Sequence, residues 1–211
     1  MICHFDKEAI LKSDSFYRRN LINCLSGYKS LNLIGTRNKD GLTNLAIFSQ
    51  VFHIGANPPM VGILLRPDTV VRHTASNILE TQFFTLNQVT SEFYKEAHWT
   101  SAKWEESEFE KTGIEPEYLD DFFAPFVKRS PLKIACKLVE TQTLQVNQTI
   151  LMIGSIEHIY VDEKGLRRDG SLDLNILDSV TVSGLDEYHV GKKLARLSYA
   201  KPDREVGEIL D

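Results

Sequence analysis

Paired cysteines and long hydrophobic runs are the features that this 211-residue sequence lacks most clearly. No apolar run approaches the roughly 18 to 20 residues that a membrane span requires, so we expect no membrane segment. Charges at residues 6–8 interrupt the apolar core that a secretory signal needs. Cys3, Cys24 and Cys136 stand far apart, and an odd number cannot all pair within one chain. We therefore expect a reducing, cytoplasmic setting.

Signatures of several function classes are also missing. The 24 basic and 29 acidic residues give a net charge of -5 without a long basic run, which argues against nucleic acid as a partner. The six histidines show neither HxxxH spacing nor clustering with cysteine, so no metal site is predicted. Phosphate-loop and Rossmann fingerprints are absent, so any NAD(P)H would bind only transiently.

Apolar residues make up 42% of the chain, which is enough to bury the core of one domain. We expect residues 1–211 to form a single domain with an N-terminal helical arm over residues 6–25 and an extended C-terminal tail. The tail after residue 165 holds a short apolar piece at 172–177 and then a polar end dotted with aromatic residues.

Alternating polarity in the first half predicts strands. Residues 30–36 alternate, and residues 38–41 provide turn chemistry with Gly41 able to adopt positive φ, so we expect a hairpin into residues 42–54. Pro58 and Pro59 should halt pairing, because proline cannot donate to a sheet ladder. Residues 60–65 form an apolar run of strand length, in which Gly62 indicates a close approach or a bulge.

The second half mixes helical and strand patterns. We expect helices over residues 68–80, capped by Asp68 or Thr69, and over 91–97, capped by Thr90 or Ser91. Residues 83–86 should form a short strand, and residues 99–126 a long, partly helical excursion. Two long strands are predicted at 132–146 and 149–161. Roughly six strands with few helices favour a mainly β fold, a barrel with helical decorations.

Five segments together resemble the flavin reductase-like family of FMN-binding split-barrel proteins. They read NLINCLSGYKSLNLIGT, NLAIFSQVFHIGANPPMVGILLRP, TVVRHTASNILETQFFTLN, EAHWTSAKWEESEFEKTGI and GLDEYHVGKKLARLSYAKP, in the order of the family. The resemblance implies a six-stranded Greek-key split β-barrel with short decorating helices. It also implies a homodimer that holds FMN near the subunit interface.

FMN needs hydrogen bonds at its pyrimidine edge, apolar walls, and positive or amide-rich surroundings for its phosphate. With the resemblance, the segment NLAIFSQ should supply backbone groups and the Ser49 hydroxyl to the polar edge of the ring. Its candidate residues are Asn44, Ala46, Ile47, Phe48, Ser49 and Gln50. Without the resemblance, the same segment is more typical of a half-exposed strand with alternating polarity, and Phe48 of a core residue.

The phosphate should lie near the end of the apolar strand that precedes Pro67. Arg66 is the first candidate, because a guanidinium at a barrel rim can bind phosphate oxygens in pairs. Thr69 could add donors at a helix N-terminus or simply cap the helix. Thr74 and Asn77, one turn further on, could face the ribityl chain or satisfy the helix surface.

Two further candidates lie outside this stretch. His98, in AHWTSA, could line the outer face of the flavin and is the only catalytic candidate, although a lone loop histidine is more often structural. Tyr199, in RLSYAKP, could reach the partner's site if the tail wraps a dimer, or it could anchor a solvated tail.

These features favour an FMN-dependent oxidoreductase that takes a hydride from NAD(P)H at flavin N5 and passes electrons to an acceptor. The alternative is a non-catalytic, flavoredoxin-like electron carrier that a protein partner reduces. The acidic balance is compatible with docking to a basic redox partner. A barrel without flavin that binds another small molecule is the third alternative.

Overall fold

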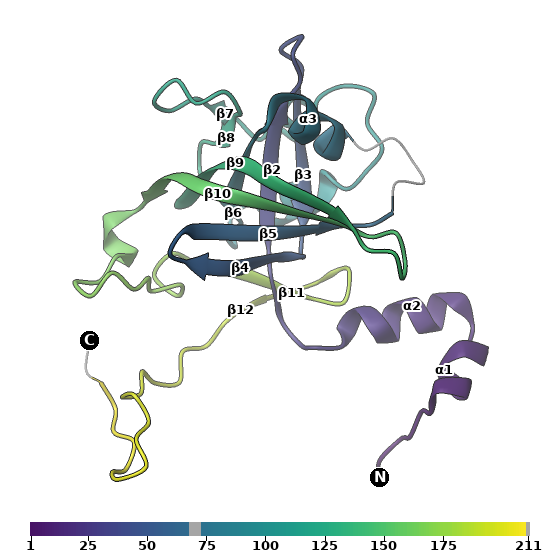
Figure 1. Cartoon of the computed structure of the whole chain (residues 1–211), viewed down its shortest axis with the longest axis vertical. Helices are drawn as coiled ribbons and strands as arrows, with labels where there is room; N and C mark the ends of the chain where they lie inside the picture. Colours follow the sequence, from purple (N-terminus) through teal and green to yellow (C-terminus); the bar gives the residue numbers. More distant parts are fainter. Residues whose placement is uncertain (68–72, 210–211) are drawn as a thin grey trace.

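A curled antiparallel sheet of seven strands forms the centre of the molecule in the computed structural model, which describes residues 1–67 and 73–209 (Figure 1). Its strand order is β3-β2-β6-β9-β10-β5-β4. The strands are β2 (Asn32–Arg37), β3 (Thr43–Phe48), β4 (Val51–Ala56), β5 (Pro59–Leu65), β6 (Phe83–Gln88), β9 (Leu132–Thr143) and β10 (Ile150–Val161). The predicted mainly β class with short helices is confirmed, with a strand count slightly above the expected six.

Smaller elements surround this sheet. A second sheet has the order β1-β11-β12, and a third pairs β7 with β8. Their bounds are β1 (Lys29–Ser30), β7 (Pro116–Glu117), β8 (Phe126–Val127), β11 (Val180–Ser183) and β12 (Glu187–Val190). The helices are α1 (Lys7–Lys12), α2 (Ser15–Cys24), α3 (His73–Thr81), α4 (Tyr94–Trp99), α5 (Glu108–Thr112) and the 3₁₀ turn η1 (Glu163–Gly165). The β11–β12 hairpin lies in the stretch that the sequence predicted to be an irregular polar tail.

The segment predicted as one strand over residues 42–54 is two strands, which corrects the prediction. The chain bends at Ser49 and Gln50, between β3 and β4. β3 forms one edge of the seven-stranded sheet, and β4 forms the opposite edge. The alternation of polar and apolar residues does not predict the break at Ser49 and Gln50, because the curl of the sheet sets the position of the bend.

The prolines do not halt pairing as expected. Ala56 pairs with Pro59, so Asn57 and Pro58 form the turn of the β4–β5 hairpin, with a cis peptide bond between them. Pro59 is the first residue of β5, a position where proline is tolerated although it has no N–H to donate to the sheet. The predicted close approach at Gly62 is made by the ring of Phe52, which pairs with it across the hairpin.

Helix ends follow side-chain caps in the N-terminal arm but not in α4. The predicted arm is two helices, and the Asp6 and Asp14 carboxylates accept N–H groups at their first turns. The cap expected at Thr90 or Ser91 is wrong: α4 begins at Tyr94, and the Ser91 hydroxyl instead donates to Asp178. Asp68 and Thr69, the caps expected for α3, lie outside the described residues.

The core has two main apolar clusters that meet at β3. One contains Leu33, Leu45 and Phe93 with Val180 and Val182 of β11, so the second sheet closes this side. The other lies between β5, β6, β9 and β10 and includes Ala75 and Ile78 of α3. By contrast, α1 and α2 bury no residue, and they project from the body as the C-terminal tail does (Figure 1).

Candidate functional site

The bend between β3 and β4 and the end of β5 form the first part of the candidate site. The backbone N–H of Leu64 donates to the carbonyl oxygen of Gln50 at 2.9 Å, so the bend lies beside the last residues of β5. Arg66 is exposed two residues beyond Leu64. No described residue bonds the side chains of Ser49, Gln50 or Arg66. This backbone contact therefore brings the bend beside the end of β5, where a hydroxyl, an amide and a guanidinium have no partner among the described residues.

Asn44, Thr74 and Asn77 also come together, but they bond mainly with one another. The Asn44 side-chain amide donates to the Thr74 hydroxyl at 2.9 Å and to the Thr36 hydroxyl at 3.3 Å. The Asn77 amide donates to the same Thr36 hydroxyl at 3.1 Å. All four side chains are buried. This network fixes α3 against β2 and β3. In this structure, the three side chains predicted to contact a ligand are therefore used to hold α3 in position.

Thr36 is the network residue that sequence reasoning missed. It was interpreted as the last residue of a strand, yet it is fully buried and receives two amide donors. A threonine inside an apolar strand was the only available signal. A second missed residue, Glu108, is buried in α5 and accepts the backbone N–H of Leu45 at 2.9 Å, which ties α5 to β3.

The apolar residues of the same segment divide between the two cores. Ile47 packs against the cluster that contains Leu33 and Phe93, whereas Phe48 packs against the cluster that contains α3. Ala46 is half-buried and pairs with Ile34 of β2. The side chains of Ile47 and Phe48 therefore pack mainly against the protein interior. A flat ligand here would be bound through backbone groups and the polar residues of the bend.

His98 lies in a different part of the molecule, on the exposed side of α4. Its Nδ1 atom is 2.5 Å from the hydroxyl oxygen of Tyr188 in β12, and the two rings meet edge to face. Burial raises the pKa of Tyr188 to about 12, and the Asp186 carboxylate adds to the shift. Because the phenol keeps its proton, it can donate to Nδ1, and in that tautomer of His98 the Nε2–H group is the outward donor.

Tyr199 does not join the site within one chain. Tyr199 lies in the tail with 83% of its surface exposed, and no described side chain bonds it. Thr69 falls outside the described residues. The catalytic candidate His98 and the tail residue are thus separate from the cradle formed by the bend, Arg66 and the buried network.

The remaining reactive groups give no competing catalytic centre. Cys136 is fully buried in β9, and burial raises the pKa of its thiol, so it is poorly suited to act as a nucleophile. Among the described residues, no three His, Cys, Asp or Glu side chains are grouped to hold a metal ion. No described helix has the length and apolar character to cross a membrane.

Comparisons with known proteins identify the family and the fold. A model of the flavin reductase like domain matches residues 29–175. A proposed flavin reductase with a split barrel domain from Shewanella frigidimarina NCIMB 400 is 52% identical, with a TM-score of 0.91, and the match covers 94% of this chain and 100% of that one. The split-barrel fold expected from the sequence is thereby confirmed.

More distant proteins share the fold or part of the sequence. Nitrilotriacetate monooxygenase component B from Bacillus cereus has 18% identity and a TM-score of 0.80, with 92% of this chain and 98% of that chain covered, which shows the fold alone. An uncharacterized protein of Aquifex aeolicus strain VF5 is 32% identical over 114 residues, and these span 52% of this chain and 58% of that protein.

Proposed function

Since this chain belongs to the flavin reductase-like family, we propose that it binds FMN and acts as an oxidoreductase that takes electrons from NAD(P)H. The observation that carries the proposal is that the polar side chains of Ser49, Gln50 and Arg66 have no partner among the described residues, whereas Asn44, Thr74 and Asn77 already bond within the protein. Such a set fits a ligand with a polar ring edge and a phosphate. When bound, FMN would supply the hydride-accepting and electron-donating chemistry.

Each part of the chain then has a task around the cofactor. Arg66 binds the phosphate through charge-assisted hydrogen bonds, and the bend at Ser49 and Gln50 holds the polar edge of the ring. The buried network of Thr36, Asn44, Thr74 and Asn77 keeps these groups in place. His98, oriented by Tyr188, lies apart from this cradle within one chain, so it would face the electron donor only where a second subunit brings it to the flavin.

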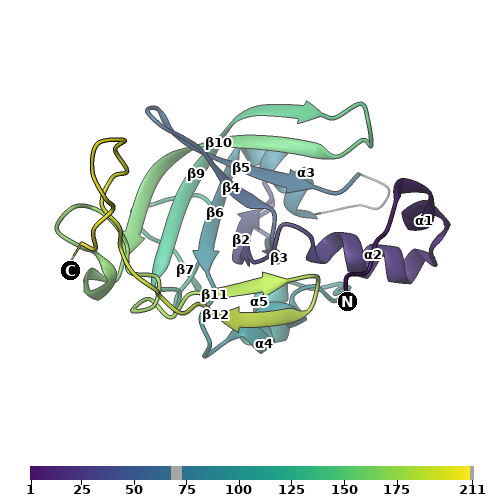
Figure 2. The same cartoon turned by 90° about the horizontal axis from the view of Figure 1, so that it is seen from below.

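We further propose that the working unit is a cytoplasmic homodimer. The arm and the tail expose large apolar side chains, with Phe16 62% and Leu194 92% exposed. The two segments project on opposite sides of the body (Figure 2), and large apolar side chains exposed on projecting segments are typical of protein contacts. A second copy of the chain that covers these segments could bring Tyr199 to the other subunit's cradle.

The decisive experiment is a visible absorption spectrum of the purified protein, followed by anaerobic titration with NADH and with NADPH. We expect a flavin band that either donor bleaches. A yellow protein that neither donor reduces, but that a reductase protein reduces quickly, would replace the proposal with the electron-carrier alternative. A colourless protein that does not bind added FMN would reject flavin function altogether.

A further inference from the structure

The turn of the β9–β10 hairpin lies beside the end of β5, next to the proposed phosphate contact. Ile150, the first residue of β10, pairs with Leu65, the last residue of β5. The two strands are antiparallel, so the residue before Ile150 stands opposite the residue after Leu65. These two residues are Thr149 and Arg66. Figure 1 shows the hairpin turn and the end of β5 on the same side of the molecule.

Thr149 and Arg66 are expected to project from the same face of this strand pair. Because Pro67 follows, Arg66 is restricted to extended backbone and continues the line of β5. Residues that stand directly opposite each other in antiparallel strands project to one face, with their Cβ atoms about 5 Å apart. Leu65 is buried in the core, and side chains alternate along a strand, so Arg66 and Thr149 share the other face.

The hairpin turn fixes the backbone of Thr149. The Leu144 N–H donates to the carbonyl oxygen of Thr149 at 2.8 Å, and the Thr149 N–H donates to the side-chain oxygen of Asn147 at 3.1 Å. The Gln148 N–H closes the same turn by donating to the Leu144 carbonyl oxygen at 2.7 Å. Both backbone groups of Thr149 are therefore bonded, and its side chain is held in one place before a ligand arrives.

The hydroxyl of Thr149, unlike its backbone, has no hydrogen-bond partner. No described residue bonds it, although only 7% of Thr149 is exposed. A buried hydroxyl without a partner is costly, so it calls for a ligand or a water molecule. The unbonded Oγ1 atom of Thr90 is enclosed by protein, whereas the Thr149 hydroxyl is not among the enclosed unbonded atoms. It therefore remains open to a ligand.

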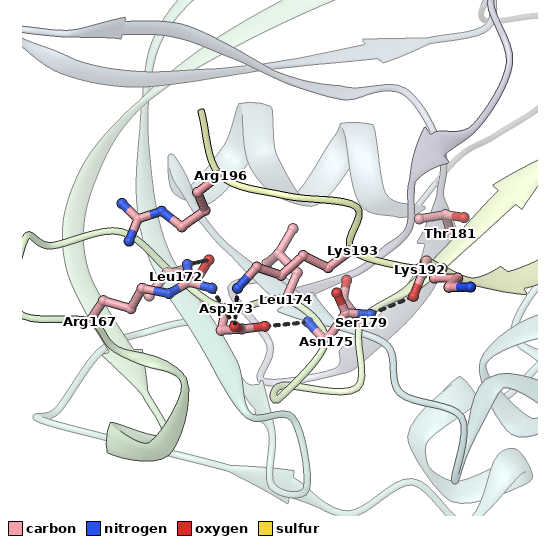
Figure 3. A pocket seen from close by; sticks show the side chains of 11 residues that line it. Arg167, Leu172, Asp173, Leu174, Asn175, Ser179, Thr181, Lys192, Lys193 and Arg196 are labelled. Carbon is pink, nitrogen blue, oxygen red and sulfur yellow. Dashed lines mark hydrogen bonds and ion pairs between the residues drawn. The ribbon is translucent and has the colours of Figure 1, made fainter. Parts of the chain in front are cut away.

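Cations elsewhere in the described chain are already paired. At the start of the C-terminal tail, the Asp173 carboxylate binds Arg167 and lies 3.8 Å from the Lys193 ammonium, as Figure 3 shows. An anion that binds there has to compete with this carboxylate. Arg66 is exposed and has no such competitor among the described residues.

We propose that the Thr149 hydroxyl is a further binding group of the flavin site and donates to the phosphate that Arg66 binds. This inference rests on the proposed FMN function. The guanidinium supplies charge and paired N–H donors, and the hydroxyl adds a charge-assisted O–H donor from the neighbouring strand. Riboflavin lacks the phosphate and gains nothing from either group. Thr149 and Arg66 together then favour FMN over riboflavin.

Fluorescence titration of the apoprotein with FMN and with riboflavin tests this role. Thr149→Val removes the hydroxyl and nearly preserves the shape of the side chain. It should raise the Kd for FMN at least about tenfold, as expected for a lost hydrogen bond to a charged group, and leave the Kd for riboflavin unchanged. Thr149→Ser keeps the hydroxyl and should bind FMN as the parent does.

Thr143→Val is the matched control, because it makes the same change at an exposed position of the same hairpin. It should leave both Kd values as in the parent, and urea unfolding curves show whether each variant is folded. A Thr149→Val protein that binds FMN as the parent does would overturn the inference and leave the proposed function standing.

Two further outcomes also count against the inference. Equal weakening of FMN and riboflavin in Thr149→Val would overturn the phosphate contact, because the lost bond would then lie on the ring or the ribityl chain. A parent protein that binds neither flavin would reject the proposed function and this role of Thr149 with it. Failure of the inference alone is thus distinguished from failure of flavin binding.

Discussion

Arg66 and Asn44 were both predicted to contact the cofactor, yet they have different surroundings at the scale of single residues. Asn44 is buried and its amide is used by Thr36 and Thr74. Arg66 is exposed, and no described residue binds its guanidinium. A group with satisfied hydrogen bonds contributes to holding a site, whereas an unpaired cation at a rim can bind a ligand directly. The phosphate contact is therefore expected at Arg66.

Replacing Arg66 with alanine should weaken FMN binding by about 1.5 to 3 kcal/mol, the value of a hydrogen bond to a charged group. This corresponds to a roughly 10- to 150-fold rise in Kd, measurable by fluorescence titration of the apoprotein. Arg168→Ala, which removes an exposed arginine from a distant loop, is the matched control. Equal affinities in the two variants would remove Arg66 from the phosphate site.

Tyr188 is expected to make the free energy of unfolding decrease at alkaline pH. Its folded-state pKa is raised to about 12, whereas an unfolded tyrosine titrates near about 10. Between these values the folded state retains a proton that the unfolded state loses. The contribution of Tyr188 to the free energy of unfolding is therefore full below about pH 10 and declines as the pH rises towards 12.

Urea unfolding at pH 8 and at pH 11 measures this effect. Between the two pH values, the free energy of unfolding should fall less in Tyr188→Phe than in the parent. Tyr199→Phe, at an exposed position, should lose as much stability as the parent; identical losses in all three would contradict this assignment.

At the scale of elements, close packing between β2 and its neighbours sets the position of the cradle. Gly35 precedes Thr36, and a Cβ atom added there would lie 2.2 Å from the carbonyl oxygen of Pro125 and 2.7 Å from the Thr85 hydroxyl. A backbone oxygen cannot swing away as a side-chain end can. The absence of a side chain at Gly35 therefore allows β2 to approach the loop before β8 this closely.

Gly35→Ala should accordingly destabilise the protein by about 1 to 3 kcal/mol, the range for overpacking a core. The free energy of unfolding from urea denaturation measures this change. Gly207→Ala introduces the same methyl group in the tail, where no atom lies within 4 Å of the added Cβ, and it should have little effect. A Gly35→Ala protein as stable as the Gly207→Ala protein would show that β2 can shift.

For the whole molecule, the arm and the tail extend away from a compact body. Neither α1 nor α2 buries a residue, and Leu197 and Tyr199 in the tail are 60% and 83% exposed. The tail keeps its own backbone contacts, since the Ser198 N–H donates to the Gly207 carbonyl oxygen at 2.8 Å. Ordered segments with exposed apolar side chains are expected to pack against another chain.

We expect light scattering to show a dimer for the full chain and a shift towards the monomer when residues 191–211 are deleted. The reason is the loss of apolar surface that the partner would cover. Substitution of both Leu194 and Leu197 by serine, which keeps the tail, should weaken the dimer in the same direction. A full chain that remains monomeric at micromolar concentration would contradict the dimer, whatever the truncated form does.

The sequence by itself determined the elements whose signals are local. Alternation predicted β2, turn residues predicted the turn at residues 38–41, and an apolar run followed by Arg66 placed the candidate phosphate contact at the end of β5. Three residues of the network, Asn44, Thr74 and Asn77, were identified only with the help of the family resemblance. Such local patterns suffice because side-chain periodicity and turn conformation depend on neighbouring residues.

Only the tertiary structure decided the features that depend on contacts between distant segments. The break at Ser49 arises because the curled sheet sends β3 and β4 to opposite edges. Thr36 became the centre of a network because α3 lies against it. Long-range packing brings these groups together, and no periodicity along the chain records which distant residues will meet.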